Sequence, residues 1–249
     1  MRKITVLFVA GLVCGYAQSA KEIAQKSYEA ISGYGSSVAM VDMVLVNARG
    51  VKTKRELKLV RKEGAKGDKS YIEFLYPNDI KGVKLLSYEV IGSDDKQWLY
   101  LPALKRIKRI SSRNKSGSFV SSEFSYEDIS SVNYQNYRYE KDFKIVSKAG
   151  AKYFKIVRKP IDKHSGYSKQ IVWVSTKDYL ARFGEYYDRH NKLLKTISFP
   201  KYKKIDGIWR VFEIDIKNVQ NHKSSKLIVK KEKIKQHIKD RDISKRVLR

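Results

Sequence analysis

The chain has 249 residues, one cysteine and a formal net charge of +27, from 53 Lys and Arg against 26 Asp and Glu. One cysteine excludes an intramolecular disulfide and any site built from several thiolates. A chain of this length buries on the order of 70% of its unfolded surface, so one core is sufficient without cross-links. The positive charge attracts polyanions, although lysines on solvated strand faces explain the same charge without a function.

The first nineteen residues have the three parts of a secretory signal. They are a positive start at Arg2 and Lys3, an apolar run over residues 4–13, and the small residues of 17–19 before a cleavage point. The apolar run is shorter than the roughly 20 residues that span a bilayer, so we expect cleavage and not a retained anchor. The expected domains are therefore a signal peptide at 1–19 and a single domain at 20–249. An exported chain meets lipid head groups or cell-wall polymers, which argues against nucleic acid as the partner.

Residues 21–31 have helical spacing of apolar and small residues, which predicts one short amphipathic helix. From residue 37 the pattern changes to period two with β-branched and aromatic residues, which predicts an antiparallel meander. We expect strands at 38–47, 52–62, 69–76, 83–91, 97–101 and 106–111, and in a second set at 137–147, 152–158, 169–175, 179–188, 192–203, 208–219 and 226–235. Because no linker or clear repeat separates the sets, we expect a mainly β fold with one large, curved sheet or barrel.

Two of these strands, 38–46 and 97–101, are apolar at almost every position, so we expect cover on both of their faces. The candidates for cover are the opening helix, residues 77–82 and the segment 112–129. If these pieces cover the sheet loosely, an apolar pocket lies between them. A fully packed core is the alternative.

The sequence lacks the motifs of the common enzyme and metal sites. Its four histidines, His164, His190, His222 and His237, have no His or acidic neighbour at metal-ligand spacing. No Gly-x-Ser-x-Gly elbow occurs, and Asp94-Asp95 lies between two strands, where Asp is a common turn former. We therefore expect a protein that is not an enzyme and has neither a metal nor a cofactor.

The stretch from Trp98 to Ile110, continued by Ser118-Phe119 and by residues 123–128, resembles the signature of the outer-membrane lipoprotein-sorting (LolA-like) family. Residues 68–70 and 80–83 fit the same pattern, and the resemblance covers residues 36–217. It implies a strongly curved antiparallel sheet, a half-open β-barrel, whose apolar concave face is covered by a few helices and receives acyl chains. It also implies a location in the periplasm of a Gram-negative-type bacterium, and its subgroup is associated with RND-like envelope transporters.

The first functional hypothesis is a monomeric periplasmic binding protein for lipid or lipoprotein acyl chains, serving outer-membrane lipoprotein sorting or lipid transport. The alternative is a cavity-free interaction module that docks on an anionic envelope polymer or on a transporter. The apolar residues expected to line the acyl cavity are Met43, Leu45, Leu57, Leu59, Phe74, Trp98, Tyr100, Phe119, Phe124 and Trp173.

Six cations follow the turn at Pro102: Lys105, Arg106, Lys108, Arg109, Arg113 and Lys115. One interpretation is a solvated strand edge that is protected from aggregation. The other is a patch that binds anionic head groups, an anionic membrane surface or an envelope transporter.

Overall fold

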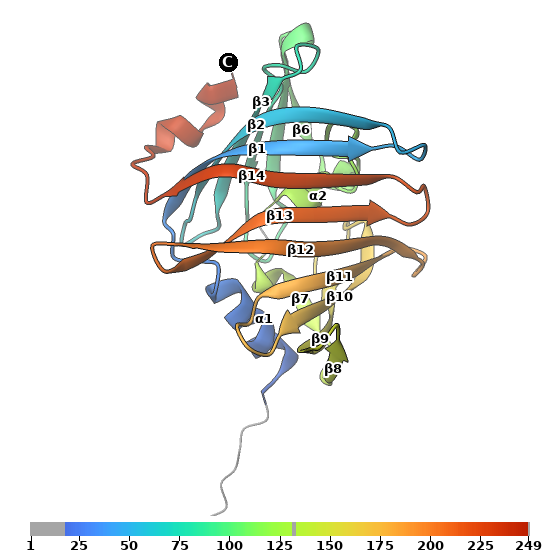
Figure 1. Ribbon diagram of the computed structural model, residues 1–249. Coiled ribbons are helices and arrows are strands. Elements are labelled where there is room, and N and C mark those ends of the chain that lie inside the picture. Colours follow the sequence, from blue (N-terminus) through green and yellow to red (C-terminus); the bar gives the residue numbers. More distant parts are fainter. Residues whose placement is uncertain (1–17, 131–132, 249) are drawn as a thin grey trace, which may run out of the picture.

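The computed structural model describes residues 18–130 and 133–248 (Figure 1). The predicted signal peptide, apart from its last two residues, lies outside the described residues. Within the described ranges, no helix is both long enough and apolar enough to cross a membrane.

The predicted opening helix is α1 (Ala20–Glu29). It begins where Ser19 accepts a hydrogen bond from the backbone of Glu22 while the Glu22 side chain accepts one from the backbone of Ser19, the reciprocal arrangement that favours helix initiation. Ile23 and Ala24 lie on its buried face. The helix thus presents an apolar stripe to the rest of the domain.

The described strands form one antiparallel sheet. Its first half contains β1 (Ser36–Val46), β2 (Lys52–Lys62), β3 (Lys69–Tyr76), β4 (Lys84–Tyr88), β5 (Lys96–Leu101) and β6 (Arg106–Ile110). Its second half contains β7 (Tyr137–Tyr139), β8 (Lys144–Lys148), β9 (Ala151–Pro160), β10 (Tyr167–Ser175), β11 (Ala181–Asp188), β12 (Leu193–Ile205), β13 (Ile208–Asn218) and β14 (Ser224–Ile234).

The sheet is a half-open barrel, because it is strongly curved and its strand order leaves two free ends. The order is β6-β5-β4-β3-β2-β1-β14-β13-β12-β11-β10-β9-β7, with β8 also paired to β9. Hairpins connect most neighbours, and the pairing of β1 with β14 joins the two halves. The sheet curves strongly but does not close, because β6 and β7 remain at its ends. The predicted fold class, a curved antiparallel sheet with a few covering helices, is confirmed.

One predicted strand is wrong. The stretch 137–147 is two strands, because β7 pairs with the end of β9 and β8 pairs with its beginning. Between them the chain turns so that Phe143 packs against Phe154, with ring centroids 5.6 Å apart. Phe143 is partly buried in this contact, and the turn that places it there interrupts the long strand that the sequence predicts.

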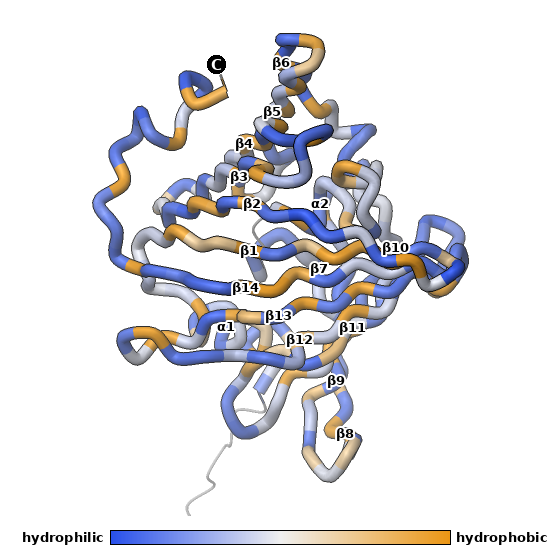
Figure 2. The backbone as a smooth tube through the Cα atoms, turned by 45° about the horizontal axis from the view of Figure 1, so that its top comes forward, coloured by the Kyte–Doolittle hydropathy of each residue, from blue (hydrophilic) through white to orange (hydrophobic). Residues whose placement is uncertain are grey.

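Hydrophilic and hydrophobic residues follow one another along the strands, as the changes of colour along the backbone show (Figure 2). On β1, Val41 and Met43 are buried on the concave face, whereas Met40 is 37% exposed on the outer face. Period-two geometry produces this division. The main core fills the concave side and contains residues from both halves of the sheet.

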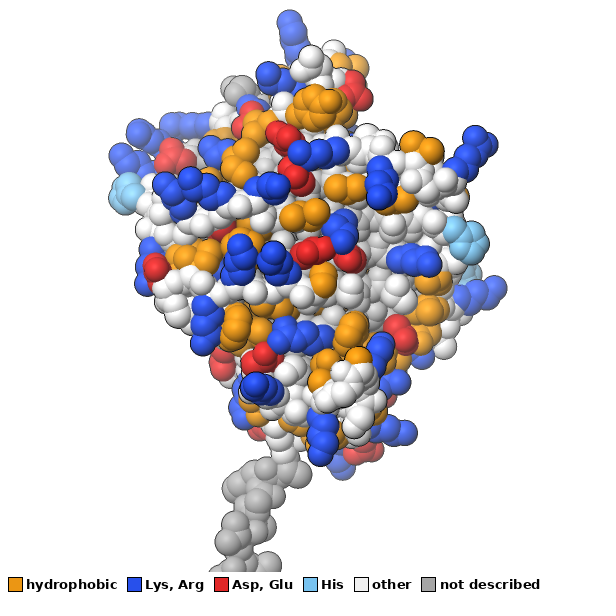
Figure 3. All heavy atoms as spheres, in the orientation of Figure 1, with side chains coloured by type: hydrophobic (Ala, Val, Ile, Leu, Met, Phe, Trp, Pro, Cys, Tyr) orange, Lys and Arg blue, Asp and Glu red, His pale blue; other side chains and the backbone are white. Residues whose placement is uncertain are grey.

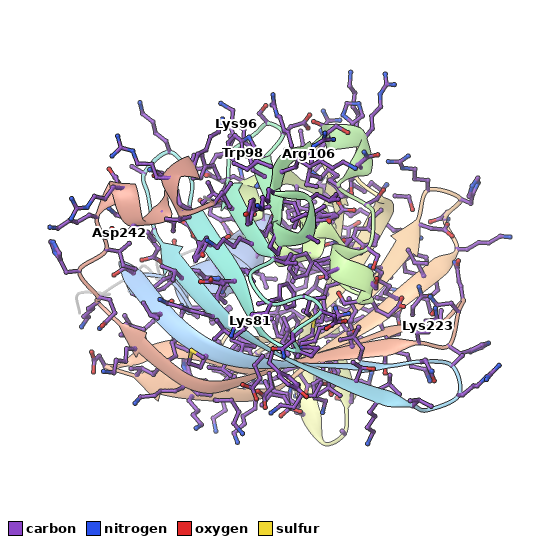
Figure 4. All side chains as sticks on the ribbon, turned by 90° about the horizontal axis from the view of Figure 1, so that it is seen from above. Lys81, Lys96, Trp98, Arg106, Lys223 and Asp242 are labelled. Carbon is purple, nitrogen blue, oxygen red and sulfur yellow. The ribbon has the colours of Figure 1, made fainter. Side chains whose placement is uncertain are left out.

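Two smaller cores lie beside the main one. In the first, α1 packs on β9 and β10 through Ile156, Val172 and Val174. In the second, the C-terminal segment 235–248 covers the outer face of β2 to β5, where Ile243 and Leu248 are fully buried. Seen from above, this segment, marked by Asp242, lies outside the curved sheet, and the segment with α2 (Tyr126–Ile129) lies inside it (Figure 4).

Candidate functional site

A cavity of about 540 Å³ lies between the concave face, α1 and the segment 111–130. This volume is in the range of small-molecule sites. Its apolar wall comes from neighbouring strands and from the covering segment: Met43, Leu57, Leu59, Phe119, Phe124, Ile197, Phe199, Ile214 and Leu227. The arrangement matches a curved sheet that its covering pieces close only in part.

Two phenylalanines anchor the covering segment in the main core. Phe119 and Phe124 are 0% and 2% exposed, and the ring of Phe119 packs 5.6 Å from that of Phe74 on β3. Ser125 then starts α2, and it exchanges side-chain and backbone hydrogen bonds with Asp128. Local capping and aromatic burial together fix where this segment crosses the sheet.

Polar contacts attach the same segment to the second half of the sheet. The Nζ of Lys195 on β12 lies 2.9 Å from Oδ2 of Asp128. The side-chain amide of Asn218 on β13 donates to Glu123 at 2.9 Å. These contacts tie the cover to β12 and β13, so its position over the cavity is determined on two sides.

Charged groups also line the cavity beside Gly92 and Ser165. Lys115 forms an ion pair with Asp162, and the carboxylate of Glu127 accepts hydrogen bonds from Ser165 and from the backbone of Gly166. Burial raises the pKa of Glu127 and that of Asp95. The cavity is therefore apolar on the sheet side and polar where these loops meet.

One group of three side chains in this region has the geometry of a cation site: Asp94, Asp162 and His164. Sequence reasoning did not find it, because Asp94 was interpreted as a turn residue and lies far along the chain from Asp162 and His164. Lys115 already supplies a positive charge to Asp162. The Nδ1 of His164 lies 3.7 Å from Asp94 and 3.6 Å from Asp162, and it is buried without a hydrogen-bond partner among the described residues.

The structure divides the ten residues that were predicted to line an acyl cavity. Those that line the cavity are Met43, Leu57, Leu59, Phe119 and Phe124. Leu45 and Phe74 pack in the same core but do not line the cavity. Trp98, Tyr100 and Trp173 lie elsewhere, so their assignment to the cavity is wrong.

The three errors are errors of strand face. On β5 the inward residues are Gln97 and Leu99, and Trp98 packs outward under the C-terminal segment. On β10 the side chain of Trp173 also points outward, where Lys155 lies 5.0 Å from its ring. Both strands have buried side chains on both faces, so hydrophobicity alone does not distinguish inside from outside.

The six predicted cations do not form one surface. Lys105, Arg106, Lys108 and Arg109, here called the basic edge, are exposed on and beside β6, and Arg113 is exposed in the loop that follows. Lys115 is withdrawn into the ion pair with Asp162. Leu104 and Ile107, 61% and 39% exposed, lie among the residues of the basic edge, which projects at one end of the molecule (Figure 2).

Elsewhere the positive charge is dispersed. Lys and Arg side chains are spread over the outer face that Figure 3 shows and alternate there with Asp and Glu. Lys226 on β14, for example, pairs with Glu213 and Asp215 on β13. Much of the net charge is therefore solvated lysine on strand faces, and the basic edge differs because apolar side chains accompany it.

Sequence reasoning missed several polar residues of the cavity wall, including Arg158 and Gln170. The alternation of side chains along a strand could have identified them, because residues two positions apart face the same side. Arg158 has the same parity on β9 as the inward Ile156, and Gln170 has the same parity on β10 as the inward Val172 and Val174.

Comparison with known proteins gives the following relatives. A family model described as an uncharacterized protein matches residues 66–249. A crystal structure of an outer membrane lipoprotein-sorting protein domain from Vibrio parahaemolyticus is 39% identical, covers 92% of this chain and 97% of that one, and has a TM-score of 0.87. No curated protein matches the chain.

Two further solved structures are similar over the same share of the chain. A DUF1329 family protein from Desulfovibrio piger is 26% identical, with coverage of 92% and 98% and a TM-score of 0.86. A LolA superfamily protein from Nitrosomonas europaea is 18% identical, with coverage of 92% and 99% and a TM-score of 0.76, which shows a shared fold.

Proposed function

Because this chain belongs to the outer-membrane lipoprotein-sorting family of LolA-like proteins, whose fold is a non-enzymatic binding fold, we propose that it holds lipid or lipoprotein acyl chains. Its relatives imply a periplasmic protein. The site is the cavity between the concave face, α1 and the segment 111–130. The role is that of a carrier in lipoprotein sorting or lipid transport.

The observation that carries this proposal is the apolar wall of the cavity. Met43, Leu57 and Leu227 lie on adjacent strands and face the same space. An acyl chain in water costs about 0.8 kcal/mol for each exposed CH₂ group, so a dry wall of this kind stabilises it without specific polar contacts. The same observation argues against the cavity-free docking module.

The basic edge supports a second part of the proposal, contact with an anionic membrane surface. Cations beside exposed Leu104 and Ile107 match the chemistry of that surface, where head groups are negative and acyl chains lie below them. A carrier needs such a contact to load or release its ligand. The edge and the cavity are separate sites.

Cavity binding can be tested by placing a charge in the wall. Leu59→Asp and Leu227→Asp each put a carboxylate into the cavity from a side chain that is only partly buried. We expect each variant to bind a fluorescent long-chain acyl probe at least about tenfold more weakly than wild type, since a charge in a dry site opposes acyl burial.

The matched control is Met40→Asp. Met40 lies on β1, between the strands that carry Leu59 and Leu227, and the variant puts the same charge on the outer face of the sheet. It should bind the probe like wild type. Circular dichroism establishes that all three variants are folded. If the two cavity variants and the control bind the probe equally, acyl chains do not occupy the cavity and the proposed function is wrong.

A further inference from the structure

A continuous row of polar residues crosses the concave face of the second half of the sheet. Cross-strand pairing places its members directly opposite one another, and residues opposite one another share a face. The row consists of Tyr139, Arg158, Gln170, Tyr186, Lys195 and Asn218. Polar residues at inward positions of an otherwise apolar wall require partners.

The covering segment supplies partners at one end of the row. Asp128 neutralises Lys195 at 2.9 Å, and Glu123 accepts from Asn218. Another arginine of the cavity wall, Arg210, is also paired, with 2.8 Å between its Nη2 and Oε1 of Glu232. Lys195 and Arg210 thus each have a carboxylate partner within the protein.

Arg158 differs from these residues. Its side chain lines the cavity and the residue is only 8% exposed. Its Nε donates to Oε1 of Gln170 at 2.8 Å, and the ring of Tyr137 lies 4.0 Å from its Cζ. The guanidinium also forms hydrogen bonds with the hydroxyls of Tyr139 and Tyr186. All of these partners are neutral, and in residues 18–130 and 133–248 no carboxylate forms an ion pair with Arg158.

An arginine in this position keeps its charge. The guanidinium does not lose its proton in proteins, and a buried charge is costly unless a counter-charge and hydrogen bonds accompany it. The ring of Tyr137, the amide of Gln170 and the two tyrosine hydroxyls compensate only in part, because none of them carries a negative charge. Burial raises the pKa of Tyr139 and that of Tyr186, so both hydroxyls keep their protons. An oxyanion is the partner that a guanidinium fits best, through two parallel hydrogen bonds.

We propose that the ligand of the cavity carries an anionic head, a carboxylate or a phosphate, and that Arg158 binds that oxyanion while the acyl chain lies along the apolar wall. This inference rests on the proposed function and narrows it. An uncharged acyl ester leaves the guanidinium without a counter-charge, so a neutral ligand binds more weakly than an anionic ligand with the same chain.

The test compares three probes that share one acyl chain: palmitic acid, palmitoyl lysophosphatidate and methyl palmitate. Wild-type protein should bind at least one of the two anions about ten- to a hundredfold more tightly than the neutral ester, as expected for hydrogen bonds to a charged group. The two anionic probes distinguish a carboxylate site from a phosphate site. Isothermal titration or displacement of a fluorescent acyl probe gives the affinities.

The decisive variant is Arg158→Gln. It should lose the preference for anions and bind methyl palmitate at least as well as wild type does. Arg158→Lys keeps the charge and should keep part of the preference. Arg61→Gln removes a cation that lines the same cavity from β2, and this variant should retain the preference.

A direct readout is the carboxyl carbon resonance of labelled palmitic acid. When the acid is bound to wild type, its carboxyl group should stay ionised to lower pH than when it is bound to Arg158→Gln, because the guanidinium favours the charged form. Equal affinity of wild type for all three probes overturns the assignment to Arg158 and leaves acyl binding intact. Loss of the preference in Arg61→Gln instead of Arg158→Gln also overturns it. No binding of any probe overturns the proposed function itself.

Discussion

Lys195 on β12 and Asp128 in α2 form a buried ion pair, with 2.9 Å between Nζ and Oδ2 and side chains that are 8% and 4% exposed. The hydroxyl of Tyr167 donates to Asp128 and accepts from Lys195. The three side chains join the covering segment to the sheet. They hold the cover in place over the cavity, and Lys195 belongs to the same row of polar residues as Arg158.

Breaking this pair from one side should destabilise the fold strongly. Asp128→Asn leaves Lys195 charged and buried, and the expected loss in the free energy of unfolding is about 3–5 kcal/mol. The double variant Asp128→Leu, Lys195→Met removes both charges and should lose much less. Urea denaturation measures both values. Equal losses in the single and double variants would contradict the view that an uncompensated charge causes the damage.

Glu89 predicts a dependence of stability on pH. Burial raises its pKa from 4.5 to about 7, and the charges of Asp68 and Asp95 act in the same direction. The folded protein therefore retains a proton that the unfolded chain has already lost. The stability from this proton is complete below about pH 4.5 and is lost as the pH rises through about 7.

The measurement is the free energy of unfolding at several pH values for wild type and for Glu89→Gln. Between pH 4.5 and 8, the free energy of unfolding of wild type should fall by up to about 3 kcal/mol relative to that of this variant, which is the equivalent of the pKa shift. The control is Glu29→Gln, at an exposed position. Its free energy of unfolding should depend on pH in the same way as that of wild type. A constant difference between wild type and Glu89→Gln across this range would show that Glu89 titrates normally.

The C-terminal segment should contribute to stability through its buried side chains. Ile243 is fully buried against the outer face of β2 to β5, and Ile243→Ala should lower the free energy of unfolding by about 2–5 kcal/mol. The Nζ of Lys245 lies 4.4 Å from the ring of Trp98. Lys245→Ala should lower the free energy of unfolding by less than about 1 kcal/mol. Urea unfolding followed by tryptophan fluorescence compares the two, and a negligible effect of Ile243→Ala would mean that the segment does not cover this face in solution.

The basic edge should govern association with anionic vesicles. Replacing Lys105, Arg106, Lys108 and Arg109 with Gln should weaken this association, since each cation near such a surface contributes about 1 kcal/mol. Raising the ionic strength from about 0.1 M to 1 M shortens the screening length from about 10 Å to about 3 Å and should have the same effect. Binding of the acyl probe should hardly change. Vesicle co-sedimentation beside probe titration measures the two separately.

The control for the basic edge is a second set of four exposed lysines changed to Gln: Lys201, Lys217, Lys223 and Lys231. The net charge falls equally in both variants. If both bind vesicles equally well, the overall charge attracts the membrane and the basic edge has no special role.

Most strands were predictable because local sequence specifies them. The predicted bounds of β2 and β3 agree with the structure, as turn residues flank both strands. The face of a strand was predictable only where one side is polar. On β5 both faces are apolar, and the assignment of Trp98 to the cavity failed there. What decides it is the C-terminal segment, which reaches β5 from more than a hundred residues later in the chain.

The role of Arg158 was not predictable for a similar reason. In the sequence it is one of many cations. Strand parity puts it on the same face of β9 as Ile156, but pairing across β7, β9 and β10 is needed to show that this face is the cavity wall. Its lack of a carboxylate partner depends on the covering segment, which reaches Lys195 and Asn218 instead. Local patterns therefore predicted the curved sheet, and contacts between distant segments determine the chemistry inside it.

The central claim, that acyl chains occupy the cavity, is tested most directly by photo-crosslinking. A long-chain fatty acid with a photoreactive diazirine near the end of its chain is bound to the protein, irradiated, and located by peptide mass spectrometry. The account predicts adducts on the cavity wall, at residues such as Phe199 and Leu227, that excess unlabelled palmitic acid suppresses. Adducts confined to the outer face, at Met40 or among the residues of the basic edge, would contradict it.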